Sequence, residues 1–191
     1  MAYEFYALLG RMRYITRWGL MRNTFSENIQ EHSHQVAVLA HALALIRRDI
    51  LHLPGPDPDR CAVAALYHDA SETLTGDLPT PIKYYNPDIM ASYKQVERAA
   101  AQRLLDMLPP ELYRSYEHLI LEDDETVLPI VKAADKLSAY IKCVEEQKAG
   151  NTEFDTALVQ TLASLRATDL PELQWFMGNC LSPFSLNIDQ L

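Results

Sequence analysis

The stretch "SENIQEHSHQVAVLAHALALI", residues 26–46, combines a long apolar run with three histidines. Its apolar residues recur three, four and seven positions apart, which is the spacing of a helix with one buried face. One stripe of this helix begins at His32 and continues through Val36 and Leu39. His34 lies on another stripe, because two positions turn an α-helix by about 200°. His32 and His34 therefore cannot easily serve the same site, and His32 stands at the edge of the buried surface.

Proline and small polar residues divide the rest of the chain into further helices. Asp57 and Asn86 each precede a proline in the first helical position, a frequent start of a helix, and Ser26 is a plausible cap for the central helix. We expect helices over about 3–18, 28–51, 58–72, 87–107 and 126–149, with shorter ones after Pro109–Pro110, after Asn151 and from Pro171. No alternating strand pattern appears. The expected fold is all-α, a compact helical bundle.

The composition is that of an ordinary globular domain. With 191 residues, of which 48% are apolar and 23% charged, the chain is expected to form a single domain over residues 1–191. The net charge of −9 argues against polymeric nucleic acid as a partner. The segment "RMRYITRWGLMR", residues 11–22, nevertheless holds four arginines and no acidic residue. A local cationic patch on an acidic protein suits a small anion, although a solvated helix face is the alternative.

Neither a membrane nor an oxidising compartment is indicated. The run "VAVLAHALALI", residues 36–46, is too short to span a bilayer, and the N-terminal residues lack the pattern of a signal peptide. The three cysteines, Cys61, Cys143 and Cys180, are far apart and odd in number. We expect core thiols in a reduced, cytoplasmic protein.

A second stretch, "LYHDASETLTGDLPTP", residues 66–81, ends an apolar helix in His68, Asp69 and Glu72. If the helix continues that far, the three side chains project over neighbouring parts of one surface. Ionisable groups at a buried surface need a hydrogen bond, a counter-charge or a metal ion. An adjacent His-Asp pair alone is a weak signal, because the pair is common.

Asp135 is a third anomaly. It interrupts the long helix in "ETVLPIVKAADKLSAYIKCVEEQ", residues 125–147, beside apolar stripes. Aspartate is unfavourable in mid-helix, and one that faces other helices requires a partner. A salt bridge to Lys132 or Lys136 is the ordinary explanation.

Together these residues meet the needs of a first-row transition metal. His32, His68, Asp69 and Asp135 offer two imidazoles and two carboxylates from three helices, a mixed N/O set suited to Mn, Fe, Co, Ni or Zn. Four protein ligands leave positions for water and substrate on an octahedral ion. Such an ion lowers the pKa of its water and polarises a phosphoryl oxygen. Glu72, surplus to the ligand set, is placed to move the proton.

The order His32, His68-Asp69, Asp135 resembles the H…HD…D signature of the HD-domain metal-dependent phosphohydrolases. The segments "RWGLMRNTFSENIQEHSHQVA" (17–37), "YHDASETLTGDLPTPIKYYN" (67–86) and "KAADKLSAYIKCVEE" (132–146) resemble the bacterial 5′-deoxynucleotidases of that superfamily. The resemblance implies an HD-domain fold, a homodimer, and hydrolysis of 2′-deoxynucleoside 5′-monophosphates to deoxynucleoside and phosphate. It also implies one divalent ion, cobalt, manganese or similar, with zinc, nickel, iron or copper as alternatives.

The resemblance also assigns roles residue by residue. It implies the metal ligands His32, His68, Asp69 and Asp135, and Glu72 as the catalytic carboxylate. It matches Arg17 and Trp18 to a pair of residues that orients the phosphate and lines the sugar site. Arg17 is therefore assigned to both catalysis and substrate binding. The loop that holds the nucleoside matches Asp77, Leu78, Pro79 and Thr80. His34 and His41 fall outside this set and are read as structural.

The chemistry of the substrate residues agrees with these roles. Arg17 can donate two parallel hydrogen bonds to phosphate, and Asp77 can accept from the 3′-hydroxyl of the sugar. Our hypothesis is that Trp18 crowds the place of a 2′-hydroxyl; an aromatic anchor in the core is the alternative reading. Glu72 either positions or deprotonates the water, or protonates the leaving 5′-oxygen.

Two other functions remain open at this point. One is an HD-type phosphodiesterase or nucleotide pyrophosphohydrolase, whose more highly charged substrates would want more basic residues than the surroundings of Arg17 supply. The other is a non-catalytic nucleotide-binding helical protein. It is disfavoured because a protein kept only for binding need not retain Glu72.

Overall fold

The computed structural model describes residues 2–79, 86–121 and 123–191. Within these ranges the chain is helical and contains no strand; the only β-type pairing is an isolated antiparallel bridge between Thr16 and Asn28. The all-α fold predicted from the sequence is confirmed.

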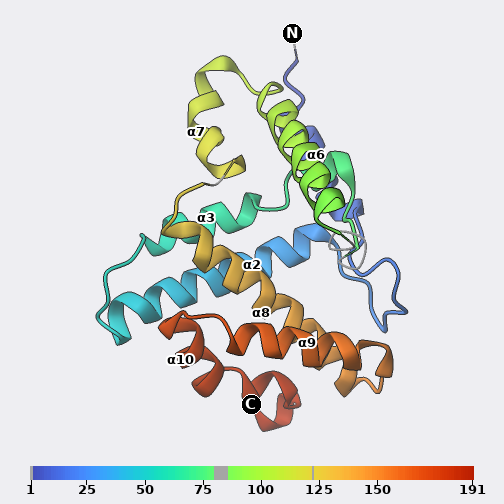
Figure 1. Cartoon of the computed structure of the whole chain (residues 1–191), viewed down its shortest axis with the longest axis vertical. Helices are drawn as coiled ribbons and strands as arrows, with labels where there is room; N and C mark the ends of the chain where they lie inside the picture. Colours follow the sequence, from blue (N-terminus) through green and yellow to red (C-terminus); the bar gives the residue numbers. More distant parts are fainter. Residues whose placement is uncertain (1, 80–85, 122) are drawn as a thin grey trace.

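Two long helices organise the bundle. α2 (Ile29–Leu45) and α8 (Val127–Lys148) cross near the middle of the molecule, with α3 (Pro58–Tyr67) packed beside them (Figure 1). α9 (Asp155–Arg166) and α10 (Pro171–Asn179) cover one end of this core, and α6 (Pro87–Leu105) and α7 (Pro110–Ile120) stand at the other. The remaining helical elements are α1 (Phe5–Leu9), α4 (Glu72–Thr75), a π-helical turn (Ile46–Ile50) and 3-10 turns at Gly10–Tyr14, Thr152–Phe154, Ser182–Ser185 and Ile188–Gln190.

The apolar interior falls into two clusters. The larger joins α2, α3, α8, α9 and α10 through fully buried residues such as Leu43, Leu137 and Leu165. The smaller joins α1 to α6 and α7 around Phe5 and Leu104. Each fully buried side chain of this size stabilises the fold by about 1.5–3 kcal/mol. The two clusters therefore fix the helices between which the ionisable residues lie.

Most helix starts follow the sequence signals. The side chain of Asp57 accepts a hydrogen bond from the Arg60 amide, and that of Asn86 accepts one from the Ile89 amide. Proline occupies the first position of α3, α6, α7 and α10. These helix starts are confirmed.

The cap of α2 was predicted wrongly. Asn28, not Ser26, caps this helix: its side-chain oxygen accepts hydrogen bonds from the amides of Gln30 and Glu31 at 3.1 and 3.0 Å. Glu31 returns the interaction by accepting from the Asn28 amide at 3.4 Å, which completes a capping box. The helix therefore begins at Ile29.

The first helix is shorter than the expected 3–18. α1 ends at Leu9, a 3-10 turn runs to Tyr14, and Ile15 is extended. The reason is pairing with the segment before α2, since the Ile29 amide donates to the Ile15 carbonyl and the Arg17 amide donates to the Glu27 carbonyl.

The helix expected over 58–72 also ends early. α3 stops at Tyr67, and tight turns lead to α4. Here the amides of Ala70 and Glu72 donate three residues back, to Tyr67 and Asp69, in place of the four-residue α-helical pattern. His68 and Asp69 thus lie on a turn and Glu72 at the start of a separate short helix, and the three do not share one straight helix.

The predicted core thiols are confirmed at two of the three cysteines. All three cysteines are present as thiols, with Cys61 and Cys143 buried and Cys180 half-buried. Among the described residues, no helix combines the length and the apolar character needed to cross a bilayer.

The cap of α2 can be tested with two single substitutions. We expect Asn28→Ala to lower the free energy of unfolding by about 1 kcal/mol, because it leaves two backbone amides without their acceptor. Ser26→Ala, two residues away, is the matched control and should change stability by less than about 0.5 kcal/mol. Urea denaturation of both variants measures the difference. A larger loss in Ser26→Ala would contradict the capping assignment.

Candidate functional site

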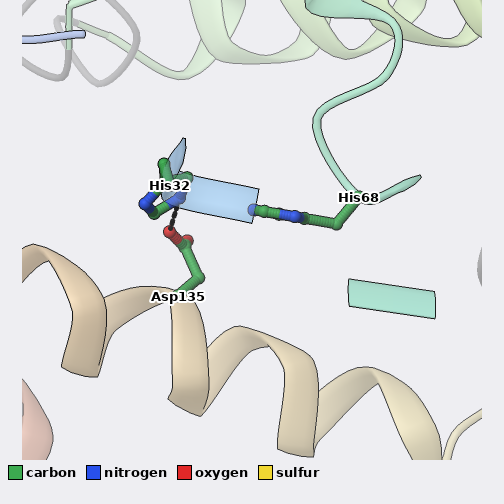
Figure 2. Close-up of side chains that lie close together, drawn as sticks. All are labelled: His32, His68 and Asp135. Carbon is green, nitrogen blue, oxygen red and sulfur yellow. Dashed lines mark hydrogen bonds and ion pairs between the residues drawn. The ribbon is translucent and has the colours of Figure 1, made fainter. Parts of the chain in front are cut away.

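Three of the predicted site residues converge where α2, α3 and α8 meet. His32 lies in the first turn of α2, His68 directly follows α3, and Asp135 projects from α8 (Figure 2). One ligand atom from each of the three lies within 4.8 Å of the others. Nε2 of His32 is 3.0 Å from Oδ1 of Asp135. His32 is fully buried, whereas the Asp135 side chain is 42% exposed, so the group opens to solvent on the α8 side.

Asp69 lies beside this group. Its Oδ2 atom is 3.2 Å from Nε2 of His68 and 3.6 Å from Nε2 of His32. The same oxygen is 3.4 Å from Nη1 of Arg17. Both carboxylates and both imidazoles named in the sequence analysis therefore face one small region.

The hydrogen bonds of His68 fix its tautomer. Its Nδ1 is 2.7 Å from the carbonyl oxygen of Ala65, which can only accept, so Nδ1 carries a proton. In the neutral ring, Nε2 is then left with its lone pair. This Nε2 atom is buried and has no hydrogen bond of acceptable geometry within the described chain. A buried nitrogen of this kind needs a proton or a cation to satisfy it.

His32 is oriented in the same way by a different partner. The Ser138 hydroxyl donates to Oε1 of Gln35 at 2.7 Å, so it accepts from Nδ1–H of His32 at 3.1 Å. Nε2 of His32 therefore points its lone pair at the carboxylates when the ring is neutral. An imidazole whose second nitrogen is held by a hydrogen bond is the usual arrangement around a metal ion.

The electrostatics of the cluster favour a cation. Burial lowers the pKa of His68, but the adjacent carboxylate of Asp69 outweighs it and raises the pKa to about 9. Burial raises the pKa of Asp69 and Asp135, but the histidines outweigh it and hold both carboxyl pKa values below their ordinary range. The two carboxylates remain ionised, and a cation between them, either the proton on Nε2 of His68 or a divalent ion, offsets their charge.

This donor set fits a first-row divalent ion. Such an ion binds imidazole nitrogen and carboxylate oxygen at about 2.0–2.2 Å, so ligand atoms facing one another across it lie about 4 Å apart. The atoms of His32, His68 and Asp135 already approach that spacing. The alternative partners considered for Asp135, Lys132 and Lys136, are exposed, and the ion pair that Asp135 makes is with His32.

Glu72 is buried next to the cluster. It opens α4, is 5% exposed, and its amide donates to the carbonyl of Asp69 at 3.0 Å. The tight turns after α3 therefore hold the backbone of Glu72 close to one of the cluster carboxylates. A carboxylate buried at this place is suited to exchange a proton.

Arg17 and Trp18 lie on the segment between the first 3-10 turn and α2. Nε of Arg17 donates to Oε2 of Glu27 at 3.1 Å, while its Nη1 reaches Asp69. Trp18 has a φ of 59°, in the left-handed region that bulky residues rarely adopt. Its ring packs against Phe154 with centroids 5.2 Å apart. The structure thus places the Arg17 guanidinium 3.4 Å from one of the cluster carboxylates.

Glu27 is a residue that the sequence analysis missed. It is only 9% exposed and accepts hydrogen bonds from both Arg17 and Trp18. No signal in the sequence singles it out, because a glutamate before a helix cap is ordinarily a solvated residue.

The segment from Arg17 to Asn28 is fastened to α8 by a buried ion pair. Lys142 and Glu146 bond to each other, and both are almost fully buried. Glu146 accepts from the Thr24 amide at 2.9 Å and from Nδ2 of Asn151 at 2.7 Å, while Nζ of Lys142 donates to the Phe25 carbonyl at 2.8 Å. The backbone of this segment is therefore held by side chains from the far end of the chain.

The other predicted residues are less closely connected to the cluster. Asp77, Leu78 and Pro79 are half-buried in the loop after α4, and Thr80 lies outside the described residues. His34 is exposed, and the half-buried His41 pairs with Asp59 at 3.3 Å. Neither histidine belongs to the cluster.

The chain is similar to known proteins over almost its whole length. Residues 4–184 match the family described as 5′-deoxynucleotidase YfbR-like. A 5′-deoxynucleotidase of Shewanella oneidensis is 47% identical over 97% of this chain and 96% of its own length. One from Erwinia tasmaniensis is 50% identical over 98% of this chain and 96% of its own length.

Solved structures show the same fold. An HD-domain phosphohydrolase of Listeria innocua aligns with a TM-score of 0.82 at 21% identity, covering 95% of this chain and 88% of that chain. The HD phosphohydrolase DatZ of cyanophage S-2L, bound to dA and one catalytic Zn²⁺ ion, aligns with a TM-score of 0.63 at 20% identity, covering 92% of this chain and 95% of that chain. The bundle is therefore the HD-domain fold.

The hydrogen bond that orients His32 can be tested through metal affinity. Ser138→Ala removes the acceptor of Nδ1–H, and we expect it to weaken binding of a divalent ion by about ten- to a hundredfold. Ser33→Ala is the matched control, because Ser33 is a buried serine adjacent to His32 in the chain. Competition with a chromophoric chelator measures both affinities. Equal affinities in the two variants would contradict the role of Ser138.

The buried ion pair on α8 predicts a pH dependence of stability. Burial raises the pKa of Glu146, but hydrogen bonds from Lys142, Asn151 and Thr24 outweigh it and lower the pKa from 4.5 to about 2. Because the folded value is depressed, the contribution is present above pH 4.5 and is lost as the pH falls towards 2. It amounts to about 3 kcal/mol at neutral pH.

We therefore expect Glu146→Gln to lower the free energy of unfolding at neutral pH by about 3 kcal/mol and to flatten the acid limb of the stability curve. Glu145→Gln is the control, since burial raises the pKa of Glu145 and its charge is not stabilised. Chemical denaturation across the acid range checks both. Parallel acid limbs for Glu146→Gln and the unmodified protein would refute the assignment.

Proposed function

The chain belongs to the 5′-deoxynucleotidase YfbR-like family, and we propose that the cluster of His32, His68, Asp69 and Asp135 is its metal centre. The protein is a phosphomonoesterase that hydrolyses 2′-deoxynucleoside 5′-monophosphates to deoxynucleoside and phosphate. The observation that carries the proposal is the convergence of two imidazole Nε2 atoms, each with its Nδ1 proton committed elsewhere, on two ionised carboxylates.

The choice of metal follows from the donor set. Two imidazoles and two carboxylates suit cobalt, manganese or a similar divalent ion, with zinc, nickel, iron or copper as alternatives. When bound, such an ion supplies a Lewis acid that polarises a phosphoryl oxygen and lowers the pKa of water. Ala65 and Ser138 keep the two imidazoles in the tautomer that exposes Nε2.

Glu72 is proposed as the proton-transfer group. Its side chain is buried at the start of α4, directly after the turn that carries His68 and Asp69. From this position it orients and deprotonates the attacking water, or protonates the 5′-oxygen as the deoxynucleoside leaves. General acid–base catalysis of this kind contributes about 10²–10⁴-fold to a rate.

Arg17 is proposed as the phosphate ligand. Its guanidinium group lies next to Asp69, with Nε and Nη1 engaged by Glu27 and Asp69. The remaining N–H groups are able to donate to phosphate oxygens, and the fixed positive charge offsets charge that builds up as the P–O bond breaks. One guanidinium suits a monoester better than the more highly charged diphosphate of a pyrophosphohydrolase substrate.

The nucleoside is proposed to lie between Trp18 and the loop after α4. Arg17 and Trp18 both donate to Oε2 of Glu27, so the indole lies close to the guanidinium proposed to bind the phosphate. Asp77, Leu78, Pro79 and Thr80 are assigned to the sugar and base through the sequence resemblance. In this proposal the indole crowds the place of a 2′-hydroxyl, and that crowding gives the enzyme its preference for deoxyribose.

Assembly and location form the remaining part of the proposal. Residues 1–191 are assigned to a single HD domain, and the resemblance to the family supports a homodimer, which sedimentation equilibrium of the purified protein tests. Reduced, largely buried thiols are consistent with the cytoplasm.

The reaction and the role of Glu72 are tested together with metal-loaded protein. We expect the unmodified enzyme to release phosphate from dAMP and to act much more slowly on AMP and 3′-dAMP. Glu72→Gln should lower kcat by about 10²–10⁴-fold, because it removes the titrating carboxyl group. Metal content and dAMP binding, measured by calorimetry, should stay close to those of the unmodified enzyme.

The exposed Glu31→Gln is the control for loss of one negative charge. Undiminished turnover in Glu72→Gln would assign proton transfer to another group. Failure of the unmodified enzyme to release phosphate from dAMP, with metal bound, would overturn the proposed reaction.

A further inference from the structure

Two donors from neighbouring residues converge on one carboxylate oxygen. Nε of Arg17 lies 3.1 Å from Oε2 of Glu27, and the indole Nε1 of Trp18 lies 3.0 Å from the same atom. We propose that Glu27 is a positioning residue that locks the phosphate ligand and the sugar wall into one rigid unit, and so sets the preference for deoxyribose. The inference rests on the proposed function, because it gives Arg17 and Trp18 the roles stated there.

The burial of Glu27 makes this contact strong. Its side chain is 11% exposed and that of Arg17 is 13% exposed. A carboxylate in such a place needs hydrogen-bond donors, and charge-assisted bonds are about twice as strong as neutral ones. The arrangement therefore differs from a surface ion pair, which contributes little.

The backbone keeps Glu27 in register with the pair. The Arg17 amide donates to the Glu27 carbonyl at 2.9 Å, beside the short antiparallel bridge between Thr16 and Asn28. Asn28 in turn caps α2, which carries His32. Glu27 therefore stands directly before the cap of α2, the helix that carries one imidazole of the cluster.

The indole is held on several sides. The Trp18 carbonyl accepts from the Met21 amide at 2.9 Å and from Nδ2 of Asn23 at 3.3 Å, which supports the left-handed backbone. Phe154 packs on the ring, and Glu27 holds the indole nitrogen. Conformations of this kind persist only where the surroundings determine them, and they gather at functional sites.

The guanidinium completes the unit. Arg17 bridges Glu27 and Asp69, so it links the indole to the cluster through one planar group. A substrate phosphate docked on Arg17 then has its sugar presented to an indole at a fixed distance. Loss of the Glu27 charge weakens its hydrogen bonds to Arg17 and to Trp18 together. The indole is then less firmly held and excludes a 2′-hydroxyl less effectively than in the unmodified enzyme.

The decisive experiment compares Glu27→Gln with Glu31→Gln in manganese-loaded protein. Gln is the same shape but offers one neutral oxygen to two donors. We expect the ratio of kcat/KM for dAMP to that for AMP to fall by about ten- to a hundredfold in Glu27→Gln. Glu31→Gln removes the same charge four residues away and should keep the unmodified ratio.

A merely structural role for Glu27 would lower both kcat/KM values equally and leave their ratio unchanged; that result overturns the inference. Metal content and circular dichroism confirm that the variant is folded. If Glu27→Gln fails to fold, Glu27→Asp, whose shorter arm cannot reach both donors, is used for the same ratio.

An independent readout separates this inference from the proposed function. In a Trp175→Phe background, Trp18 is the sole tryptophan, and Glu27→Gln should shift its fluorescence emission without substrate. If the unmodified enzyme fails to prefer dAMP, the proposed function fails. The emission then decides the positioning role alone: a shift supports it, and an unchanged spectrum overturns it.

Discussion

The arrangement of this molecule depends on one buried imidazole at the crossing of α2 and α8. His32 has no exposed surface, so bulk water cannot satisfy its nitrogens and their partners must lie inside the site. The Ser138 hydroxyl of α8 accepts a hydrogen bond from Nδ1–H of His32. The carboxylate of Asp135, one turn earlier on the same helix, faces Nε2. Where α8 meets α2, its polar residues Asp135 and Ser138 are required by the hydrogen bonds of His32. The apolar residues around them determine how closely the two helices approach. The same contact fixes both the packing of the helices and the direction of the imidazole.

The early end of α3 is equally consequential. On an ideal α-helix, His68 and Asp69 point about 100° apart, which separates adjacent side chains. After Tyr67 the backbone amides donate to carbonyls three residues earlier, which tightens the chain. Nδ1 of His68 donates to the Ala65 carbonyl. The turn brings both side chains towards His32 and starts α4 at Glu72. A short break in a helix places three ionisable groups where a regular helix would spread them.

Much of this was readable from the sequence because it depends on local rules. Proline and cap residues place most helix starts, and the spacing of His32, His68, Asp69 and Asp135 indicates a cluster. The failures share a different cause. Asn28 displaced Ser26 as the cap because Glu31 reciprocates, and the first helix ended early because its chain pairs with residues before α2. Glu27 gains its role from Arg17 and Trp18 across a turn. Lys142 and Glu146 are four residues apart on one helix, but their contacts to Phe25 and Thr24 lie far along the sequence, and no spacing rule records them.

The fastening of residues 17–28 to the end of α8 has a consequence for biosynthesis. Thr24 and Arg22 are held by Glu146 and Asn151, more than a hundred positions later in the chain. During translation the N-terminal segment leaves the ribosome long before these anchors exist, and closing so long a loop is slow compared with forming local helices. The nascent chain therefore forms its local helices before the contacts that hold residues 17–28 in place can exist.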